Sequence, residues 1–169
     1  FEAQDDWRAF SLALANTGGY NIALGYRSMR SNTTGVSNNV IGSFALYNST
    51  TANYNVSLGE YTLYNATNGS NTAIGYQAGK AITTGSSNSL LGNNVGSTTL
   101  ATGTGNILVG TSSAVDTPTA STSNWLNIGN TVYGDLSNHR IALGNGLTTT
   151  TAGVTFDLGS VTDSMRLPK

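Results

Sequence analysis

A short element that ends in glycine recurs nine times along this chain, and this repeat restricts the fold more than any other feature of the sequence. Six copies share one frame of four residues and a glycine, from residues 21–25 to residues 106–110, and three looser copies follow. The nine glycines are spaced by 17, 17, 16, 17, 18, 19, 15 and 15 residues. Self-similarity at a nearly fixed period indicates a repeat architecture, in which each unit buries its apolar face against its neighbours.

The residue before each glycine is aliphatic in all nine copies, whereas the residue one place earlier is small, polar or apolar. Alternation of this kind, ended by glycine, predicts a short half-buried strand followed by a turn. We therefore expect the aliphatic column to face the core and the variable column to face solvent or a loosely packed surface. The predicted core column consists of Leu24, Ile41, Leu58, Ile74, Leu91, Val109, Ile128, Leu143 and Leu158.

Two further columns recur at the same period. A weaker apolar column lies four residues after the glycine, at Met29, Leu46 and Leu63, and it lapses at Gly79 and Gly96. A threonine-rich corner follows, with recurring threonines at positions 34, 51, 67 and 84. Stacking of the repeats would turn these threonines, and the asparagines that begin the six regular copies, into ladders.

These patterns predict an all-β fold. Gly, Ser, Thr and Asn make up 85 of the 169 residues and favour turns and strands over helices. A repeat of about 15–19 residues, at roughly 3.3 Å each, is too short for helix-containing repeats, so the sequence predicts a β-solenoid or β-roll. One or two aliphatic residues per repeat give one chain little core, so we expect a parallel homotrimer, intertwined or side by side. A single-chain coil is the alternative.

The pattern divides the chain into three parts. Residues 1–18 are expected to form an entry or cap segment, and residues 19–115 the regular stack. Residues 116–169 are expected to form divergent repeats with longer corners, with Pro118 at the break.

Charge and composition exclude several classes of function. A net charge of −1, with seven scattered basic residues, does not provide the basic surface of a nucleic-acid-binding protein. No apolar run is long enough to cross a membrane, so we expect no membrane insertion. The chain has no cysteine, which excludes disulfides and thiolate chemistry.

Few residues are suited to catalysis. His139 is the only histidine, and Glu60 is the only acidic residue within the regular repeats. A polysaccharide-degrading enzyme would need two carboxylates about 5–9 Å apart, and such a pair could come from Asp116, Asp135 and Asp157 if they clustered in a groove. We expect no catalytic residue, no cofactor and no metal site.

Seven of the eight tyrosines lie in the first five repeats. Tyr47 and Tyr64 occupy equivalent positions, as do Tyr26 and Tyr76. Aromatic rings with a polar edge are typical of receptor-binding or sugar-stacking surfaces, so these four are candidate receptor contacts. The alternative is that they pack between chains or cover a thin core.

Repeats such as residues 69–79, Gly-Ser-Asn-Thr-Ala-Ile-Gly-Tyr-Gln-Ala-Gly, and residues 20–29 resemble the Asn-Thr-Ala-Val-Gly-Tyr-Gln-Ala repeats of bacteriophage tail fibres. They resemble the head β-roll of trimeric autotransporter adhesins more distantly. The resemblance implies a segment of a longer, fibrous homotrimer on a virion that serves host attachment without enzymatic activity. Its implied partners are other tail components and a host-surface polysaccharide or protein receptor. The alternative is a bacterial surface adhesin of the same architecture.

Overall fold

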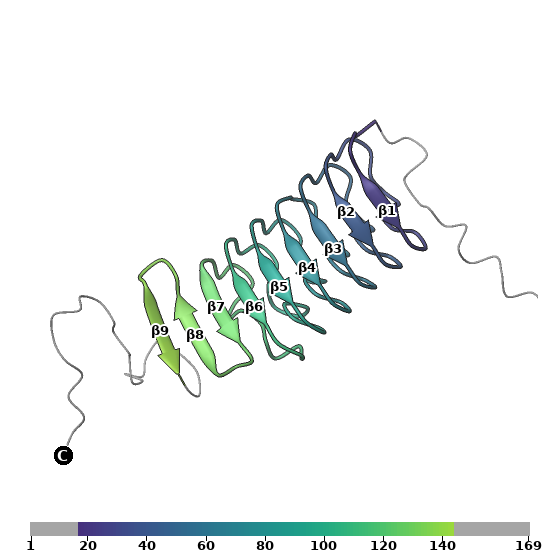
Figure 1. Ribbon diagram of the computed structural model, residues 1–169. Coiled ribbons are helices and arrows are strands. Elements are labelled where there is room, and N and C mark those ends of the chain that lie inside the picture. The colour runs from purple at the N-terminus through teal and green to yellow at the C-terminus, as the bar shows by residue number, and fades with distance from the viewer. Residues whose placement is uncertain (1–16, 144–169) are drawn as a thin grey trace, which may run out of the picture.

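The computed structural model describes residues 17–143, which form an all-β solenoid with no helix in that range (Figure 1). No helix long and apolar enough to cross a membrane occurs in these residues. One sheet contains nine short strands in sequence order. The strands are β1 (Ile22–Leu24), β2 (Asn39–Ile41), β3 (Val56–Leu58), β4 (Thr72–Ile74), β5 (Ser89–Leu91), β6 (Ile107–Val109), β7 (Trp125–Ile128), β8 (Val132–Asp135) and β9 (Arg140–Leu143).

The first seven strands are parallel, and each belongs to one coil of the solenoid, here termed a rung. Equivalent repeat positions pair directly, as Ala23 does with Val40 and Val40 with Ser57. The predicted β-solenoid is therefore confirmed. β8 and β9 then reverse direction and pair antiparallel. The looser copy at residues 140–144 thus supplies a strand, but this strand belongs to a meander and not to a further parallel rung.

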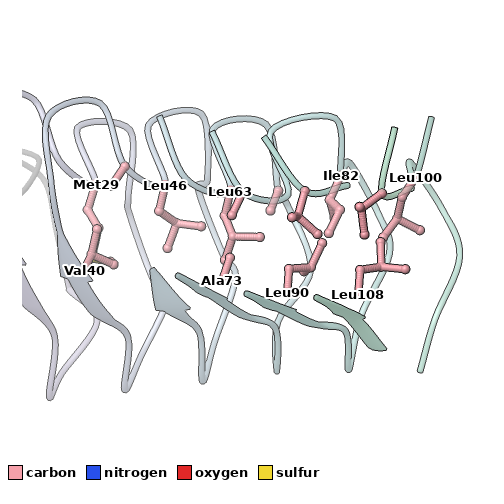
Figure 2. Close-up of a cluster of buried hydrophobic side chains, with 14 of the residues drawn as sticks. Met29, Val40, Leu46, Leu63, Ala73, Ile82, Leu90, Leu100 and Leu108 are labelled. Atoms are coloured by element: carbon pink, nitrogen blue, oxygen red, sulfur yellow. The ribbon is translucent and has the colours of Figure 1, made fainter. Parts of the chain in front are cut away.

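The interior is formed by the middle residue of each three-residue strand. Val40, Ala73 and Leu108 are completely buried, and Ser57 and Asn127 are buried at the same position of their rungs. The opposite side of the interior comes from the return arm, defined as the segment after each glycine. Met29, Leu46 and Leu63 in this arm are also completely buried, so the weaker apolar column is core. Figure 2 shows return-arm and corner side chains meeting strand side chains across this narrow space.

The predicted inward orientation of the main aliphatic column is wrong for the chain by itself. Its members alternate with the buried middle residues, and successive strand side chains point to opposite faces. They therefore lie on the outside of the sheet. Leu24, Ile41, Ile74, Leu91, Ile128 and Leu143 are exposed, Leu58 and Val109 are half-buried, and Leu158 lies outside the described residues.

The variable column of the strand faces inward because the strand and the return arm compensate for each other in side-chain size. The return-arm position of Met29 and Leu63 has a left-handed backbone, with φ near +48°. Gly79 and Gly96 take this position in later rungs without the steric cost that a side chain meets there. A Cβ on Gly79 would lie 2.8 Å from Cδ2 of Leu63 and 3.2 Å from Cδ1 of Ile82. Neighbouring side chains thus fill the space that the glycine leaves.

A buried asparagine ladder joins the rungs. Asn38 donates from its backbone N and from Nδ2 to Oδ1 of Asn21, each at 3.0 Å, and Asn55 repeats both bonds to Asn38. The same two bonds link Asn88 to Asn71 and Asn106 to Asn88. Nδ2 also donates to a corner carbonyl, as in Asn88 to Gly103 O at 3.0 Å. The predicted asparagine ladder is confirmed, and its amides satisfy one another away from water.

The ladder ends where the parallel coil ends. Trp125 occupies the next position of this column, and its backbone N donates to Oδ1 of Asn106 at 2.9 Å. An indole has no carbonyl to accept the corresponding bonds from a following rung. β8 then runs antiparallel to β7, so the substitution coincides with the change in topology.

The threonine corners stack through a different column from the one predicted. The hydroxyls of Thr33, Thr67 and Thr83 donate to backbone carbonyls of the following rung at 3.0–3.2 Å. Thr67 is the member of the predicted set that makes this bond. In the other rungs the equivalent residues are Thr33 and Thr83, each one place before the predicted positions 34 and 84. The corner at residues 66–69 has a single threonine, so Thr67 belongs both to the predicted set and to the column observed.

Asn88→Ala should destabilise the solenoid by about 3 kcal/mol, because it leaves the buried donors of Asn106 without their acceptor. The exposed Asn93→Ala is the matched control and should stay close to the parent. Chemical unfolding followed by circular dichroism measures both. Equal midpoints for the two variants would contradict a stabilising ladder.

Candidate functional site

Two of the tyrosines predicted as receptor contacts, Tyr47 and Tyr64, form the centre of an aromatic cluster on the return arms. Tyr47 and Tyr64 stack face to face, with ring centroids 5.2 Å apart and planes 1° from parallel. Phe44 and Tyr61 form a second stacked pair at 5.0 Å. The two pairs contact each other side by side, with centroids 5.6 Å apart. One face of each ring is therefore used within the cluster.

The other two predicted tyrosines lie at different places. Tyr26 packs its ring edge-to-face against Phe44 at 5.3 Å, and the guanidinium of Arg27 lies 4.9 Å from the centre of the Tyr26 ring. Tyr76 is exposed, and its hydroxyl accepts a hydrogen bond from Nε2 of Gln77. The structure therefore unites Tyr26, through Phe44, with Tyr47 and Tyr64, and gives Tyr76 no ring contact among the described residues.

Sequence reasoning missed Phe44 and Tyr61 as members of this cluster. They lie exactly one rung apart, two residues after their glycines, and this periodicity was the available signal. Lys80 Nζ lies 5.5 Å from the centre of the Tyr61 ring, so cations flank both ends of the cluster. These contacts favour packing as the role of the stacked faces and leave ring edges and hydroxyls for contact with other molecules.

Asp116 is buried and serves as a backbone anchor. Its Oδ2 accepts from the backbone N of Thr98 and Thr99 and from the Thr98 hydroxyl, at 2.8–3.0 Å. Its Oδ1 accepts from the backbone N of Leu100 and Thr117 at 2.8–2.9 Å. Five donors occupy the lone pairs of this carboxylate, so it is committed to holding two chain segments together.

Asp135 has a different, exposed role in the turn between β8 and β9. It accepts hydrogen bonds from Asn138 Nδ2 and from the backbone N of Ser137 and Asn138. The Asn138 side-chain bond is the main cause that holds the pKa of Asp135 below its usual value. A general acid needs a raised pKa, so this carboxyl is poorly suited to that part of glycoside hydrolysis. Asp157, the third predicted partner, lies outside the described residues.

The other residues weighed for catalysis are exposed on separate parts of the surface. His139 lies in the turn before β9 with φ of +53°, and Glu60 follows β3. Within residues 17–143, no three His, Asp or Glu side chains lie close enough together to hold a metal ion.

A pocket of about 350 Å³ lies where the parallel coil meets the antiparallel strands. The segment from Ser113 to Pro118 and Thr99 form one side, and residues of β7, β8 and the turn between them form the other. Trp125 and Tyr133 contribute aromatic rings, with centroids 6.1 Å apart and planes tilted by 47°. No sequence pattern predicts this pocket, because its lining residues come from segments that the repeat pattern does not align.

Asparagines shape the base of this pocket. Asn127 occupies the inward strand position and donates from Nδ2 to the backbone O of Asp116 and to Oδ1 of Asn130. Oδ1 of Asn127 accepts from the backbone N of Asn130, and the Tyr133 hydroxyl donates to the Asn130 backbone O at 2.9 Å. The pocket is therefore held by a defined hydrogen-bond network.

Comparison with known protein families, with curated proteins and with solved structures finds no match for this chain.

Asp116→Ala should destabilise the protein by about 3 kcal/mol or more, because it leaves buried backbone donors without an acceptor. Asp135→Ala removes a carboxylate from an exposed turn and should cost much less. Thermal unfolding of both variants at neutral pH checks this difference. A larger loss for Asp135→Ala would show that Asp116 is not the anchor described.

Proposed function

We propose that this chain is a structural and adhesive segment of a trimeric fibre, of the kind found in bacteriophage tails, that serves attachment to a host cell. The single observation that carries the proposal is the outer face of the sheet. The eight described members of the aliphatic column lie on this outer face, where folding of one chain does not require them.

This face is extensive and uncharged along β1–β7. Its two outward columns contain aliphatic residues, Asn, Thr and Ser, with no acidic or basic residue. The exposed Ile and Leu side chains of the sheet have relative exposures of 37–58%. They form a contiguous exposed apolar patch, of the kind that marks a protein interaction surface.

Self-association explains the contrast between the two strand columns. The inward column tolerates Ala, Ser, Val, Leu and Asn because the return arm compensates for its size. The outward column has no such compensation within the described residues, yet it is aliphatic in all eight copies that the structure describes. Identical parallel chains would bring identical columns together and remove a continuous apolar stripe from water.

The resemblance to tail-fibre repeats supports the placement of this segment on a virion, next to other tail components. The aromatic cluster and its flanking cations supply hydroxyls and positive charge on the surface for contact with a host polysaccharide or protein. Binding of the fluorescently labelled protein to intact bacterial cells tests attachment directly. Absence of binding to every bacterial strain tested counts against the proposal.

The mass of the native particle tests whether the chain forms a trimer. We expect about three times 17.4 kDa in sedimentation equilibrium. A concentration-independent mass of one chain would contradict the proposal.

Two adjacent substitutions separate folding from association. Leu58→Asp places a charge on the outer face and should reduce the mass to that of one chain while the β-sheet signal in circular dichroism remains. Ser57→Asp places a charge in the closed interior, where Ser57 Oγ contacts the Thr62 hydroxyl, and should abolish folding at a cost of about 3 kcal/mol or more. Thr84→Asp, at an exposed corner, is the control and should change neither.

The reverse result would overturn this assignment of faces. It would consist of a folded Ser57→Asp variant together with an unfolded Leu58→Asp variant.

A further inference from the structure

We propose that the pocket between the parallel coil and the β8–β9 strands binds a neutral saccharide. The binding claim stands on the pocket itself, and its use in host attachment rests on the function proposed above. Four features of the pocket favour such a ligand: its size, its aromatic surface, its unpaired polar groups and its charge.

The size fits a small ligand. At about 350 Å³ the pocket is at the lower end of the range for small-molecule sites, which is enough for one or two sugar rings. Trp125 and Tyr133 supply tilted aromatic surfaces against which the C–H face of a pyranose can pack.

Several polar groups around the pocket lack partners within the described part of the chain. They are Oγ of Ser113, Oγ1 of Thr99 and Nδ2 of Asn130, none of which makes a hydrogen bond to residues 17–143. The buried indole Nε1 of Trp125 is also without a partner in this range. Ser113 is exposed and Thr99 and Asn130 are half-buried, so these three groups are open to a ligand with several hydroxyls, which offers both donors and acceptors.

The hydrogen-bond network keeps these groups in place before a ligand arrives. Asn130 is fixed by Asn127 through its backbone N and its Oδ1, so its free Nδ2 has a defined direction. Tyr133 is fixed by its hydroxyl bond to the Asn130 backbone O. A prearranged site loses less freedom on binding.

The charge of the pocket selects among saccharides. The residues that line it include the Asp116 carboxylate and no Lys, Arg or His. The carboxylate is already hydrogen-bonded to five donors, and its negative charge disfavours a second carboxylate nearby. Neutral hexoses and N-acetylhexosamines are therefore expected to bind, whereas uronic and sialic acids are expected to be excluded.

Saturation-transfer difference NMR on the full-length protein tests this inference. The probes are glucose, galactose, N-acetylglucosamine, N-acetylgalactosamine and their disaccharides at millimolar concentration, with glucuronate and N-acetylneuraminate as acidic comparisons. We expect saturation transfer to at least one neutral probe and none to the acidic ones. No transfer to any neutral probe, or equal transfer to the acidic ones, would overturn the proposal.

Matched variants locate the binding. Ala114 is exposed and lines the pocket, so Ala114→Trp should fill it and abolish the signal. Ala120→Trp adds the same side chain at an exposed position outside the pocket and should leave the signal unchanged. Asn130→Gly suits the local φ of +57° and removes the free amide, so it should weaken binding about tenfold. Circular dichroism of each variant confirms that the sheet is intact.

A signal that survives Ala114→Trp would place the saccharide elsewhere and refute the pocket site. The native mass of the same sample separates this outcome from the fibre proposal. If the protein is a trimer and binds no neutral saccharide, only the pocket proposal is contradicted. If it is a single chain and binds one, only the fibre proposal is contradicted.

Discussion

The buried asparagine ladder is the interaction on which the rest of this structure depends. At most levels an asparagine side-chain oxygen accepts two bonds from the following rung, whereas Asn55 accepts one, from the backbone N of Asn71. The side-chain amides donate to the preceding rung or to a corner carbonyl. A parallel strand of three residues has few backbone bonds with which to fix its register. The ladder adds bonds that form when equivalent residues lie directly above one another, so a one-residue slip would leave buried amides unpaired. The parallel stacking of β1–β7 follows from this requirement.

A constant cross-section is the second requirement, because every rung must fit on its neighbour. The interior meets it by exchanging volume between the strand and the return arm. Leu90 packs where Gly96 leaves space, and Ile82 fills the gap beside Gly79. Close packing therefore fixes the combined side-chain volume of the strand and the return arm, and it leaves the volume at each single position free to vary. The outer face has no such constraint within one chain, which is why its uniform aliphatic character points to other copies of the chain.

The sequence was sufficient to predict the rung and the strand, but it was insufficient to tell the inside from the outside. The period, the strand positions, the turn glycines and the asparagine ladder all follow from residues that repeat in a linear pattern. A constant aliphatic column usually marks a core, yet in a coil this narrow Ser57 is inside while Leu58 is on the outer surface. Two features could not be predicted, because no repeat relates their parts. They are the antiparallel end after Trp125 and the pocket formed by Thr99, Asn130 and Tyr133.

The function proposed for this chain divides between two ends of one structure. The regular rungs supply length, a uniform face for association and an aromatic cluster along the return arms. The end of the ladder at Trp125 breaks the regularity, and that break creates the concave site that a uniform coil lacks.

Hydrogen exchange of asparagine side-chain amides, followed by NMR, measures whether the ladder is closed to water in solution. We expect slow exchange for the Nδ2 protons of Asn55 and Asn88, which are buried in the ladder, and fast exchange for the exposed Asn93. Exchange of Asn55 and Asn88 at the rate of Asn93 would contradict the ladder as the element that holds the rungs together.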